Sequence, residues 1–522
     1  EIASTDPFGT LVATDFVTAE YSDVLDNTPV AVCDHTQAYV NATVPQIDAI
    51  PAVDDSYAVC VKLTDDAGNV TYGKSGAVVR DTDPPTLTSL ALTGVAADGY
   101  VNAVDAASSG AFATLTASGH SSAAYTDILG NAGSLVCDDM QDYLNLAIPA
   151  VNTIPAVDDD YAVCVKIADA AGNAVYGSSG IAARETVPPD FTSFSLANEA
   201  SDGYLNATEV GASGDFATLV AADYTDDAYS APLDNDPAIT CNHTVSYANA
   251  AVPPLSDVPA TDGDYVVCVR LADAAGNVTY GVSDVLRRDV QPPLFTALAL
   301  ANDAADGFVN AAESASGAAF ATLTASGFSV EDYSLPLADD PSVTCDGNVS
   351  YGEAAVPPIS ATPAVDGPYA VCVSLSDAAG NVIYGKSDVA IRDVVAPAAT
   401  AVTSTTPCCS YGESSPINVT LTLDDDVTLG GTSGDVELSL ETGATDRAAL
   451  LDLPLGGPTS TLSFTYTVQA GDTSADLDIH ATAPQLSYTG VRMLADAAGN
   501  PLNPDLSAAT SLAANAALII DT

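Results

Sequence analysis

The pentapeptide DAAGN at residues 169–173 returns at 273–277, 377–381 and 496–500, and DDAGN at 65–69 is a near copy. In chain order, the first four of these five stretches are 104 residues apart. A catalytic motif is normally present once per active site, whereas a turn recurs as often as the folded unit that contains it. The spacing therefore predicts a repeated architecture.

The residues on either side of this turn predict a β-hairpin. In YAVCVKL at 57–63 the side chains alternate with a period of two residues. A strand presents alternate residues on opposite faces. One face would receive Tyr57, Val59, Val61 and Leu63. NVTYG at 69–73 then brings the chain back. Gly68 and Asn69 supply the unusual backbone angles of the turn, and Asp65 can bond nearby backbone amides.

The cysteines follow the same period, because four pairs occur, each 27 residues apart and each 104 residues from the next. These pairs are Cys33 and Cys60, Cys137 and Cys164, Cys241 and Cys268, and Cys345 and Cys372. One pair per repeat is typical of an intra-repeat disulfide formed in an oxidising compartment, which predicts secretion. The alternative is four pairs of reduced, buried thiols.

The position of the second cysteine predicts where the disulfide lies. Cys60 comes three residues after Tyr57, so its side chain is expected on the outward face of the strand. The disulfide is then expected to staple a sheet surface or a loop, and not to join two sheets through the core.

Further short strands are expected upstream, at TLTSLALT (86–93), FATLTAS (112–118) and SLVCDD (134–139). Many short strands separated by Gly, Asp and Pro within about 100 residues predict a β-sandwich. The fold class is therefore all-β.

An acidic loop, a Tyr that opens the penultimate strand, alternating valines, DAAGN and a Pro-containing linker together resemble bacterial immunoglobulin-like (Big-type) repeats. The resemblance covers residues 1–395. It implies tandem immunoglobulin-like β-sandwiches, as in the arrays of surface adhesins and extracellular fibres, and it specifies no ligand.

Residues 396–522 differ from the repeats before them. STLSFTYTVQAGD (460–472) and LADAAGN (494–500) resemble a repeat of swimming-motility and haemolysin-type bacterial surface proteins. That resemblance implies another sandwich in a secreted, often calcium-rich setting. Cys408 and Cys409 have no partner elsewhere, which leaves open a vicinal disulfide or an intermolecular link.

Proline-containing linkers divide the chain into five expected modules. The linkers are RDTDPP (80–85), RETVPP (184–189), RDVQPP (288–293) and RDVVAP (392–397). The modules are repeat 1 (1–83), repeat 2 (84–187), repeat 3 (188–291), repeat 4 (292–395) and a diverged C-terminal module (396–522). Because the linkers are short and proline restricts the backbone, the modules are expected to be held semi-rigidly end to end as a rod.

Repeat 1 lacks some 21 residues that match 84–104 of repeat 2, and its first strand is among them. An incomplete sandwich exposes an unpaired edge and an unfilled core groove. Either the strand lies upstream in a longer array, which a complete C-terminal module favours, or a neighbouring chain donates it.

Composition narrows the function classes. There are 69 acidic residues against 12 basic ones, and the net charge of −57 repels nucleic acid and anionic membrane surfaces. No apolar run is long enough for a membrane span. Converging carboxylates on such a surface would attract divalent cations, of which calcium is the natural candidate.

The expected calcium ligands come from two places in each repeat. Oxygen donors at short intervals around a glycine occur at DGYVNAVD (98–105) and its counterparts, and further acids lie in the linkers and turns. The candidates are Asp98, Asn102, Asp105, Glu185, Asp202, Asp273, Asp289, Asp306 and Asp377. Asp98, Glu185 and Asp273 are expected to meet at one junction between modules. The alternative is that all of these are hydrated turn acids.

The linker arginines also keep register, at Arg80, Arg184, Arg288 and Arg392. Each is expected to bridge carboxylates across a junction, and the alternative is that it ends the last strand in solvent. An exposed pair would contribute only about 0 to 1 kcal/mol.

No catalytic constellation is present, and the four histidines are not spaced as metal ligands. We therefore predict a non-enzymatic, extracellular structural protein, the stalk or repeating subunit of a bacterial surface fibre, whose partners are copies of itself or adjoining repeats of a longer chain. The alternative is an adhesin segment that binds a receptor or glycan.

Overall fold

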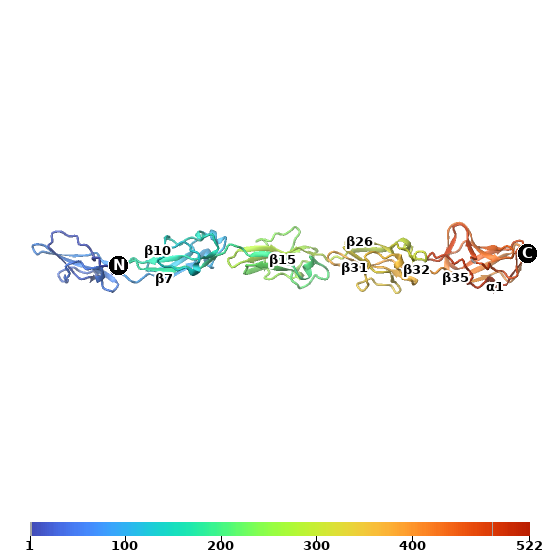
Figure 1. Cartoon of the computed structure of the whole chain (residues 1–522), viewed down its shortest axis with the longest axis horizontal. Helices are drawn as coiled ribbons and strands as arrows, with labels where there is room; N and C mark the ends of the chain where they lie inside the picture. The colour runs from blue at the N-terminus through green and yellow to red at the C-terminus, as the bar shows by residue number, and fades with distance from the viewer. Residues whose placement is uncertain (1–2, 483) are drawn as a thin grey trace. The chain divides into compact units, whose positions relative to one another are not determined.

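The computed structural model describes residues 3–482 and 484–522. Within these residues the chain is built from strands, and helix is confined to short turns such as α1 (Leu512–Asn515), as Figure 1 shows. The predicted all-β class is confirmed. Residues 1 and 2 of repeat 1 and residue 483 of the C-terminal module lie outside the described residues.

The chain divides into two compact units, each described here by itself. The first unit comprises Glu1–Ser201, Ser213–Asp257 and Tyr265–Val285. The second comprises Asp202–Ala212, Val258–Asp264 and Leu286–Thr522.

In the first unit, repeat 1 forms two three-stranded sheets. The sheet β1-β4-β5 consists of β1 (Thr18–Tyr21), β4 (Cys60–Thr64) and β5 (Val70–Lys74). The sheet β2-β3-β6 consists of β2 (Leu25–Asp26), β3 (Asp55–Ala58) and β6 (Val78–Arg80). The core between them contains Phe8, Tyr21, Tyr57 and Val59.

Repeat 2 has the same plan, with three strands that repeat 1 lacks and no counterpart of β2. The sheets β10-β12-β13 and β11-β14-β8 correspond to those of repeat 1, and β7 and β9 form a separate pair. The strands are β7 (Thr86–Leu92), β8 (Tyr100–Val101), β9 (Ala113–Ser118), β10 (Ser122–Tyr125), β11 (Asp159–Tyr161), β12 (Cys164–Ala168), β13 (Ala174–Ser178) and β14 (Ala182–Arg184). The segment 134–139, predicted as a strand, is instead a loop, because it carries Cys137 to its disulfide partner.

Two sheets of repeat 3 also lie in the first unit. β15 (Asp190–Leu196) pairs with β17 (Ala217–Ala222). β21 (Cys268–Ala272) lies between β18 (Asp226–Tyr229) and β22 (Val278–Val282). The same unit pairs β19 (Leu233–Asp234) with residues Tyr265 and Val266.

The predicted single strand 57–63 is wrong in one respect, because the chain changes sheets at Val59. β3 belongs to one sheet and β4 to the other, so Tyr57, Ala58, Val59 and Cys60 are all buried. Backbone amides at such a break have no ladder partner and need another acceptor. The Val59 amide donates to Ser75 Oγ (3.0 Å), and the Cys60 amide donates to Ser22 Oγ (2.9 Å).

The four repeat cysteine pairs form disulfides, with Cα atoms 5.4 Å apart for Cys33 and Cys60 and 5.5 Å apart in the other three. The disulfide ties a loop to a strand, and Cys60 lies outside the core cluster of repeat 1. Cys60 is nevertheless fully buried. The loop of Cys33 covers it, and Tyr39 of that loop packs on Tyr72 with ring centroids 5.5 Å apart.

The predicted hairpin around DDAGN is confirmed. β4 and β5 pair in antiparallel register from Cys60 opposite Lys74 to Thr64 opposite Val70, and the turn fills the space between them. The same register joins β12 to β13.

The second unit begins with segments of repeat 3, in which β16 (Tyr204–Leu205) pairs in parallel with β23 (Leu286–Arg288). Repeat 4 follows with the pair β24-β26, the sheet β27-β30-β31 and the sheet β25-β32-β29-β28. Its strands are β24 (Leu294–Leu300), β25 (Phe308–Val309), β26 (Ala321–Ser326), β27 (Val330–Tyr333), β28 (Leu337–Ala338), β29 (Gly367–Ala370), β30 (Cys372–Ser376), β31 (Val382–Lys386) and β32 (Ala390–Arg392).

The C-terminal module has its own core between an eight-stranded and a three-stranded sheet. The larger sheet contains β33 (Ala399–Ser404), β35 (Pro416–Gly430), β36 (Val436–Glu441), β37 (Arg447–Leu451), β38 (Thr459–Thr467), β40 (Asp478–Ile479), β41 (Leu486–Tyr488) and β42 (Met493–Ala495). The smaller contains β34 (Cys409–Tyr411), β39 (Thr473–Ser474) and β43 (Leu518–Asp521).

The motif FTYTVQAGD owes its composition to packing in this module. Tyr466 donates to the buried carboxylate of Asp472, which also accepts from Arg447 Nε at 3.0 Å.

Among the described residues, no helix is long and apolar enough to cross a membrane.

Candidate cation sites at the junctions between repeats

The DAAGN turn is held by its own first and last residues. In repeat 2, Asp169 Oδ1 accepts from the amides of Ala171, Gly172 and Asn173 at 2.8, 2.8 and 3.0 Å. Gly172 has φ +96°, a left-handed conformation that favours glycine. In repeat 1, hydrogen bonds from the side chain and backbone of Asn69 lower the pKa of Asp65.

The closing asparagine of the turn also reaches the linker that precedes its own repeat. In the first unit, Asn173 Nδ2 donates to the carbonyl of Asp81 and Asn277 Nδ2 to that of Glu185, both at 2.9 Å. In the second unit, Asn381 Nδ2 donates to the carbonyl of Asp289 (2.8 Å) and Asn500 Nδ2 to that of Asp393 (2.9 Å). One residue therefore fixes both the turn and the linker.

A second asparagine completes the contact from the preceding repeat. Asn102 Nδ2 of repeat 2 donates to the carbonyl of Ala275 (2.8 Å), which lies in the DAAGN turn of repeat 3. In the second unit, Asn206 Nδ2 donates to Ala379 O and Asn310 Nδ2 to Ala498 O, both at 3.0 Å.

The contact is reciprocal at the two junctions of the second unit. The amides of Ala207 and Ala311 donate to Asn381 Oδ1 and Asn500 Oδ1, both at 2.9 Å. We call the contact between this loop asparagine of one repeat and the DAAGN turn of the next the asparagine clasp. From the sequence, Asn381 was predicted only to shape the turn and Asn206 only to be an oxygen donor to a cation, so the clasp was missed.

The acids near the clasp in the first unit gather around Glu185. Burial raises the pKa of the half-buried Glu185, and repulsion from neighbouring carboxylates adds to the effect. Those carboxylates belong to Asp273, Asp158 and Asp223. Asp273 is 8% exposed, and both of its side-chain oxygens accept from Asn277.

The corresponding acids of the second unit lie closer together. Single oxygens of Asp393, Asp425 and Asp496 all lie within 4.8 Å of one another. Burial raises the pKa of Asp393, and repulsion from Asp496, Asp366 and Asp425 adds to it. Asp393 and Asp496 occupy the linker and turn positions held by Glu185 and Asp273 in the first unit.

The remaining predicted ligands bond within their own loop. Asp98 accepts from the Tyr100 amide at 3.0 Å, and Asp202 and Asp306 repeat this contact with Tyr204 and Phe308. Asn102 Oδ1 accepts from the amides of Val104 and Asp105, and Asp105 Oδ2 accepts from the Asn102 amide at 3.4 Å. The side-chain oxygen of Asn102, which was predicted as a cation ligand, is thus used by the loop, and its side-chain nitrogen is used by the clasp.

Asp289 and Asp377 hold the linker and turn positions at the junction of repeats 3 and 4. Asp289 Oδ1 accepts from the Gln291 amide at 3.2 Å, and Asp377 accepts from Asn381. The position of Asp223 is taken there by Gly327. That junction therefore has no acid at the position of Asp223.

The chemistry of the cluster of Asp393, Asp425 and Asp496 fits a hard cation in part. Calcium takes six to eight oxygen ligands, and three converging carboxylates could supply a share of them. Because Asp425 is exposed, water could reach the cluster around Asp393. The repulsion that raises the pKa values of Glu185 and Asp393 is what a bound cation would relieve.

The linker arginines do not bridge the junctions, which corrects the prediction. Each pairs with an aspartate of its own repeat: Arg80 with Asp54, Arg184 with Asp158, Arg288 with Asp262 and Arg392 with Asp366. The side chains of these arginines are only 9 to 13% exposed, so they do not end the strands in open solvent either. The aspartate lies in the loop before the strand that pairs with the arginine's strand.

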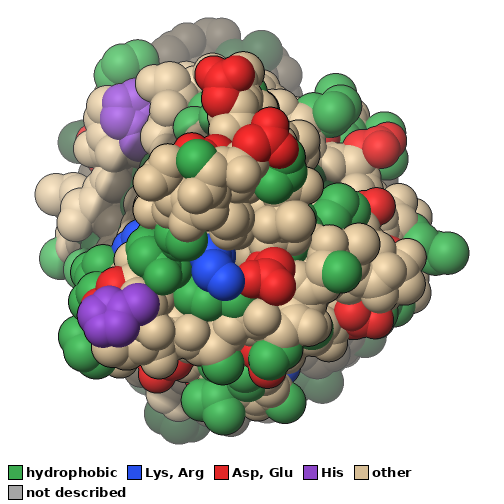
Figure 2. Space-filling view, turned by 90° about the vertical axis from the view of Figure 1, so that its left-hand side faces the viewer, with side chains coloured by type: hydrophobic (Ala, Val, Ile, Leu, Met, Phe, Trp, Pro, Cys, Tyr) green, Lys and Arg blue, Asp and Glu red, His purple; other side chains and the backbone are tan. Residues whose placement is uncertain are grey.

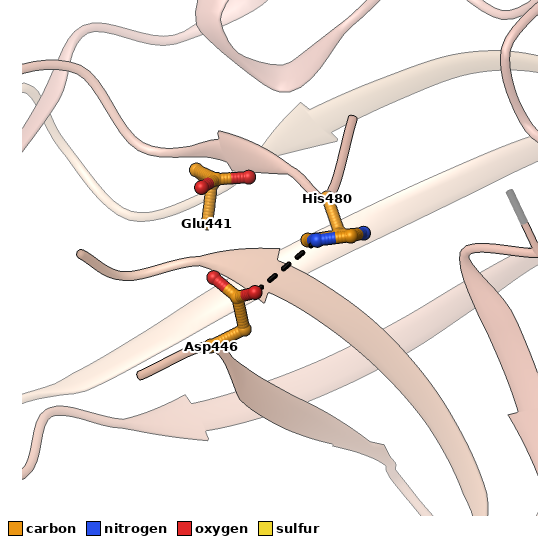
Figure 3. Close-up of side chains that lie close together, drawn as sticks. All are labelled: Glu441, Asp446 and His480. Atoms are coloured by element: carbon orange, nitrogen blue, oxygen red, sulfur yellow. Dashed lines mark ion pairs between the residues drawn. The ribbon is translucent and has the colours of Figure 1, made fainter. Parts of the chain in front are cut away.

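The C-terminal module contains a further cluster that the sequence analysis missed. Figure 3 shows His480 facing Asp446, with Glu441 beside them. His480 Nε2 and Asp446 Oδ2 are 3.2 Å apart, and the two acids are exposed. Because the three residues come from separate strand ends, their spacing in sequence carried no signal.

Two other features bear on the predicted sites. Cys408 and Cys409 are both free and exposed, so the structure contains no vicinal disulfide between them. On the face in Figure 2, acidic side chains are scattered among hydrophobic and other polar ones, and basic side chains are few.

No protein-family model matches the sequence, and no curated protein matches it either. Among solved structures, a calcium-stabilised adhesin with which an Antarctic bacterium binds ice is 18% identical, covers 79% of this chain and 99% of its own, and has a TM-score of 0.30. A tetra-tandem repeat from the extending region of a large adhesion protein is 16% identical, with coverages of 80% and 97% and a TM-score of 0.29.

The extracellular domain of protocadherin γB4 is 10% identical, with coverages of 98% and 77% and a TM-score of 0.28. TM-scores of this size do not assign a function. The resemblance to Big-type and motility-protein repeats stays a prediction.

Proposed function

We propose that this chain is a structural, non-enzymatic segment of a bacterial surface fibre or stalk, in which successive repeats are docked to one another. The asparagine clasp is the observation that carries the proposal. It joins the loop of one repeat to the turn of the next through side-chain bonds of 2.8 to 3.0 Å. A chain of independent domains on free linkers would not need it.

The five predicted modules, at 1–83, 84–187, 188–291, 292–395 and 396–522, are the units of this proposal. The clasp residues and the linker carbonyls that they contact repeat at these boundaries, which supports the division. One disulfide in each of the first four modules supports an extracellular location, since disulfides persist in oxidising compartments.

Calcium is the proposed cation at the cluster around Asp393 and, by analogy of position, at the acids near Glu185. Asp393, Asp425 and Asp496 would hold it in the second unit, and Glu185, Asp223 and Asp273 in the first. Bound calcium would offset the repulsion among these carboxylates and stiffen the junction. The predicted ligands Asp98, Asp202 and Asp306 are not included, because none of them is among the carboxylates whose repulsion raises the pKa of Glu185 or Asp393.

The test is electron microscopy of the native material with and without a calcium chelator. A structural segment is expected to appear as repeating density in filaments or straight stalks. A monomeric chain that binds a receptor or glycan and never occurs in such density would contradict the proposal and favour the adhesin alternative. Filaments that stay straight in chelator would contradict the calcium part alone.

A calorimetric titration separates the cation from the architecture. Calcium added to the chelated chain is expected to bind with saturation and to raise the melting temperature. In Asp393→Asn the heat assigned to the second-unit cluster should disappear, while Asp98→Asn, the matched control, should leave the titration unchanged.

A further inference from the structure

The first strand of a complete repeat packs one of its side chains directly on the backbone of a glycine. In repeats 2, 3 and 4 that glycine is Gly177, Gly281 or Gly385. A Cβ placed on these residues would lie 2.2 Å from Leu87, 2.1 Å from Phe191 and 2.2 Å from Phe295, respectively. The second residue of the first strand therefore fills the space that the missing glycine side chain leaves, and we call this space the glycine socket.

The glycine socket of repeat 1 is empty among the described residues. Its glycine is Gly73, and a Cβ there would meet only Val61 Cγ1, at 3.1 Å. A groove of about 390 Å³ runs past it. The apolar lining of this groove includes Phe8, Leu11, Tyr21, Val59, Val61 and Leu63.

The burial of matching residues shows what covers this groove in a complete repeat. Val165 and Ile167 of repeat 2 are fully buried, whereas their counterparts in repeat 1, Val61 and Leu63, are only partly buried. A covering strand would remove this apolar surface from water.

Among the residues that the structure describes, no strand pairs with the backbone edge beside the groove. β9 of repeat 2 pairs with β7 along its whole length, from Leu92 opposite Ala113 to Thr86 opposite Ser118. The counterpart of β9 in repeat 1 is residues 9–14, which form no strand in the structure. Such an edge is a template for one further antiparallel strand.

A second cavity marks the rest of the missing segment. It has a volume of about 520 Å³ and lies at the end of repeat 1, lined among others by Ile47, Val78, Val79 and Ala171. At the next junction, β8 and Asn102 occupy the corresponding position: β8 pairs with β14, and Asn102 donates to Ala275 O. β6 and Ala171 are the counterparts of β14 and Ala275. The two cavities are thus the footprint of one segment, the match of residues 84–104.

We propose that repeat 1 binds an extended segment with the pattern of residues 84–104. Its strand pairs antiparallel with residues 9–14 and places a Leu or Phe in the glycine socket of Gly73. Its following loop adds a strand to β6 and donates from an asparagine to Ala171 O. The contacts that join repeat 2 to repeat 3 are then also made between repeats 1 and 2.

The occupant is a segment of this chemistry and not one of the paired strands of a second copy. Within the described residues, the three strands of this pattern are β7, β15 and β24. Each is already paired in its own repeat, with β9, β17 and β26. A second copy could donate one of them only by opening another repeat in the same way.

The experiment uses the full chain and a synthetic peptide with the sequence of residues 188–208, PPDFTSFSLANEASDGYLNAT. Calorimetry is expected to show saturable one-to-one binding, and hydrogen exchange to show new protection of residues 9–14. A peptide with Phe191→Ala lacks the group that fills the socket and should bind on the order of tenfold more weakly.

Two variants of the chain test whether the peptide binds in the groove. Gly73→Val fills the socket and should weaken binding at least as much, whereas Gly352→Val, at a site with no atom within 4 Å of an added Cβ, should leave it unchanged. In a chain with residues 84–104 joined ahead of Glu1, the added segment should fill the groove, so this chain should not bind the peptide.

Three results would overturn the proposal. The first is no binding by a chain whose repeat 1 is folded, as reported by its slow-exchanging β4 amides. The second is equal binding by Gly73→Val and the unaltered chain. The third is sedimentation of the peptide-free chain as a dimer that Gly73→Val abolishes, since the groove would then belong to a second copy.

Discussion

Repeats 1 and 2 follow one plan but differ by the segment that carries the first strand. The disulfide, the DAAGN hairpin and the hydroxyl acceptors at the sheet change are present in both. What repeat 1 lacks is the cover over Val61 and Leu63 and the partner of residues 9–14. The comparison teaches that the hairpin and disulfide define the repeat, while the first strand closes its core.

The largest effect is expected from removing the disulfide in each of the two repeats. Closing a loop of this length restricts the unfolded chain by about 3.5 kcal/mol at 25 °C. Cys33→Ala with Cys60→Ala should unfold the open repeat 1, whereas Cys137→Ala with Cys164→Ala should leave repeat 2 folded but weakened. Limited proteolysis with mass mapping of the cut sites distinguishes the two, and equal resistance of both repeats would break the comparison.

Adding one methyl group to the glycine socket is expected to give the next largest effect. Gly385→Ala forces a Cβ into the ring of Phe295, and overpacking of this kind costs about 1 to 3 kcal/mol. In Gly73→Ala the new Cβ meets only Val61, so the stability of repeat 1 should change by only a few tenths of the cost expected at Gly385. Denaturant unfolding of each variant gives the difference, and a cost at Gly73 as large as that at Gly385 would show that its socket is filled.

The asparagine clasp gives a smaller contrast between the repeats. Asn381→Ala removes bonds to Asp289 O and from the Ala207 amide, and an unsatisfied polar group costs about 1 to 3 kcal/mol when it is buried. Asn69→Ala, the control, removes bonds only to Asp65 among those described. Calorimetry should show repeat 4 melting earlier in the first variant, and identical melting curves for both would mean that the clasp does not couple the repeats.

The smallest effect concerns pH and compares Glu185 with Asp65. The pKa of Glu185 is raised in the folded state, so its unfavourable contribution at pH 7 is relieved as the pH falls towards that pKa. The pKa of Asp65 is lowered, so its favourable contribution is present at neutral pH and is lost as the pH falls through the folded value.

Glu185→Gln is therefore expected to melt slightly higher than the unaltered chain at pH 7 and equally at about pH 4.5, near the ordinary pKa of a glutamate. Melting temperatures at the two pH values measure this. A variant that melts lower at pH 7 would show that the charge of Glu185 is stabilising, as it would be if a cation were bound during the measurement.

The periodic features of the fold could be predicted from sequence because they depend on residues close together in the chain. The 104-residue step, the cysteine pairs, the hairpin and the incomplete first repeat are of this kind. The change of sheet at Val59 could not be predicted, since alternation of Tyr57, Val59 and Val61 is the same in an unbroken strand. Its acceptors, Ser75 and Ser22, lie 16 and 38 residues from the amides they serve.

The candidate site was less predictable for a related reason. Asn102 carries an oxygen near acidic residues, which made it a candidate cation ligand, but its amide bonds a carbonyl 173 residues away. Arg184 was expected to reach across the junction, yet its partner Asp158 lies in the same repeat. A side chain's sequence neighbours do not reveal which distant backbone group will face it.

Hydrogen exchange of the full chain, resolved by mass spectrometry, tests most directly the claim that four repeats share one fold and only the first is open. Residues 9–14 are expected to exchange quickly, while β9, β17 and β26, their counterparts in repeats 2, 3 and 4, remain protected by their paired strands. Equal and strong protection of all four segments would contradict the claim.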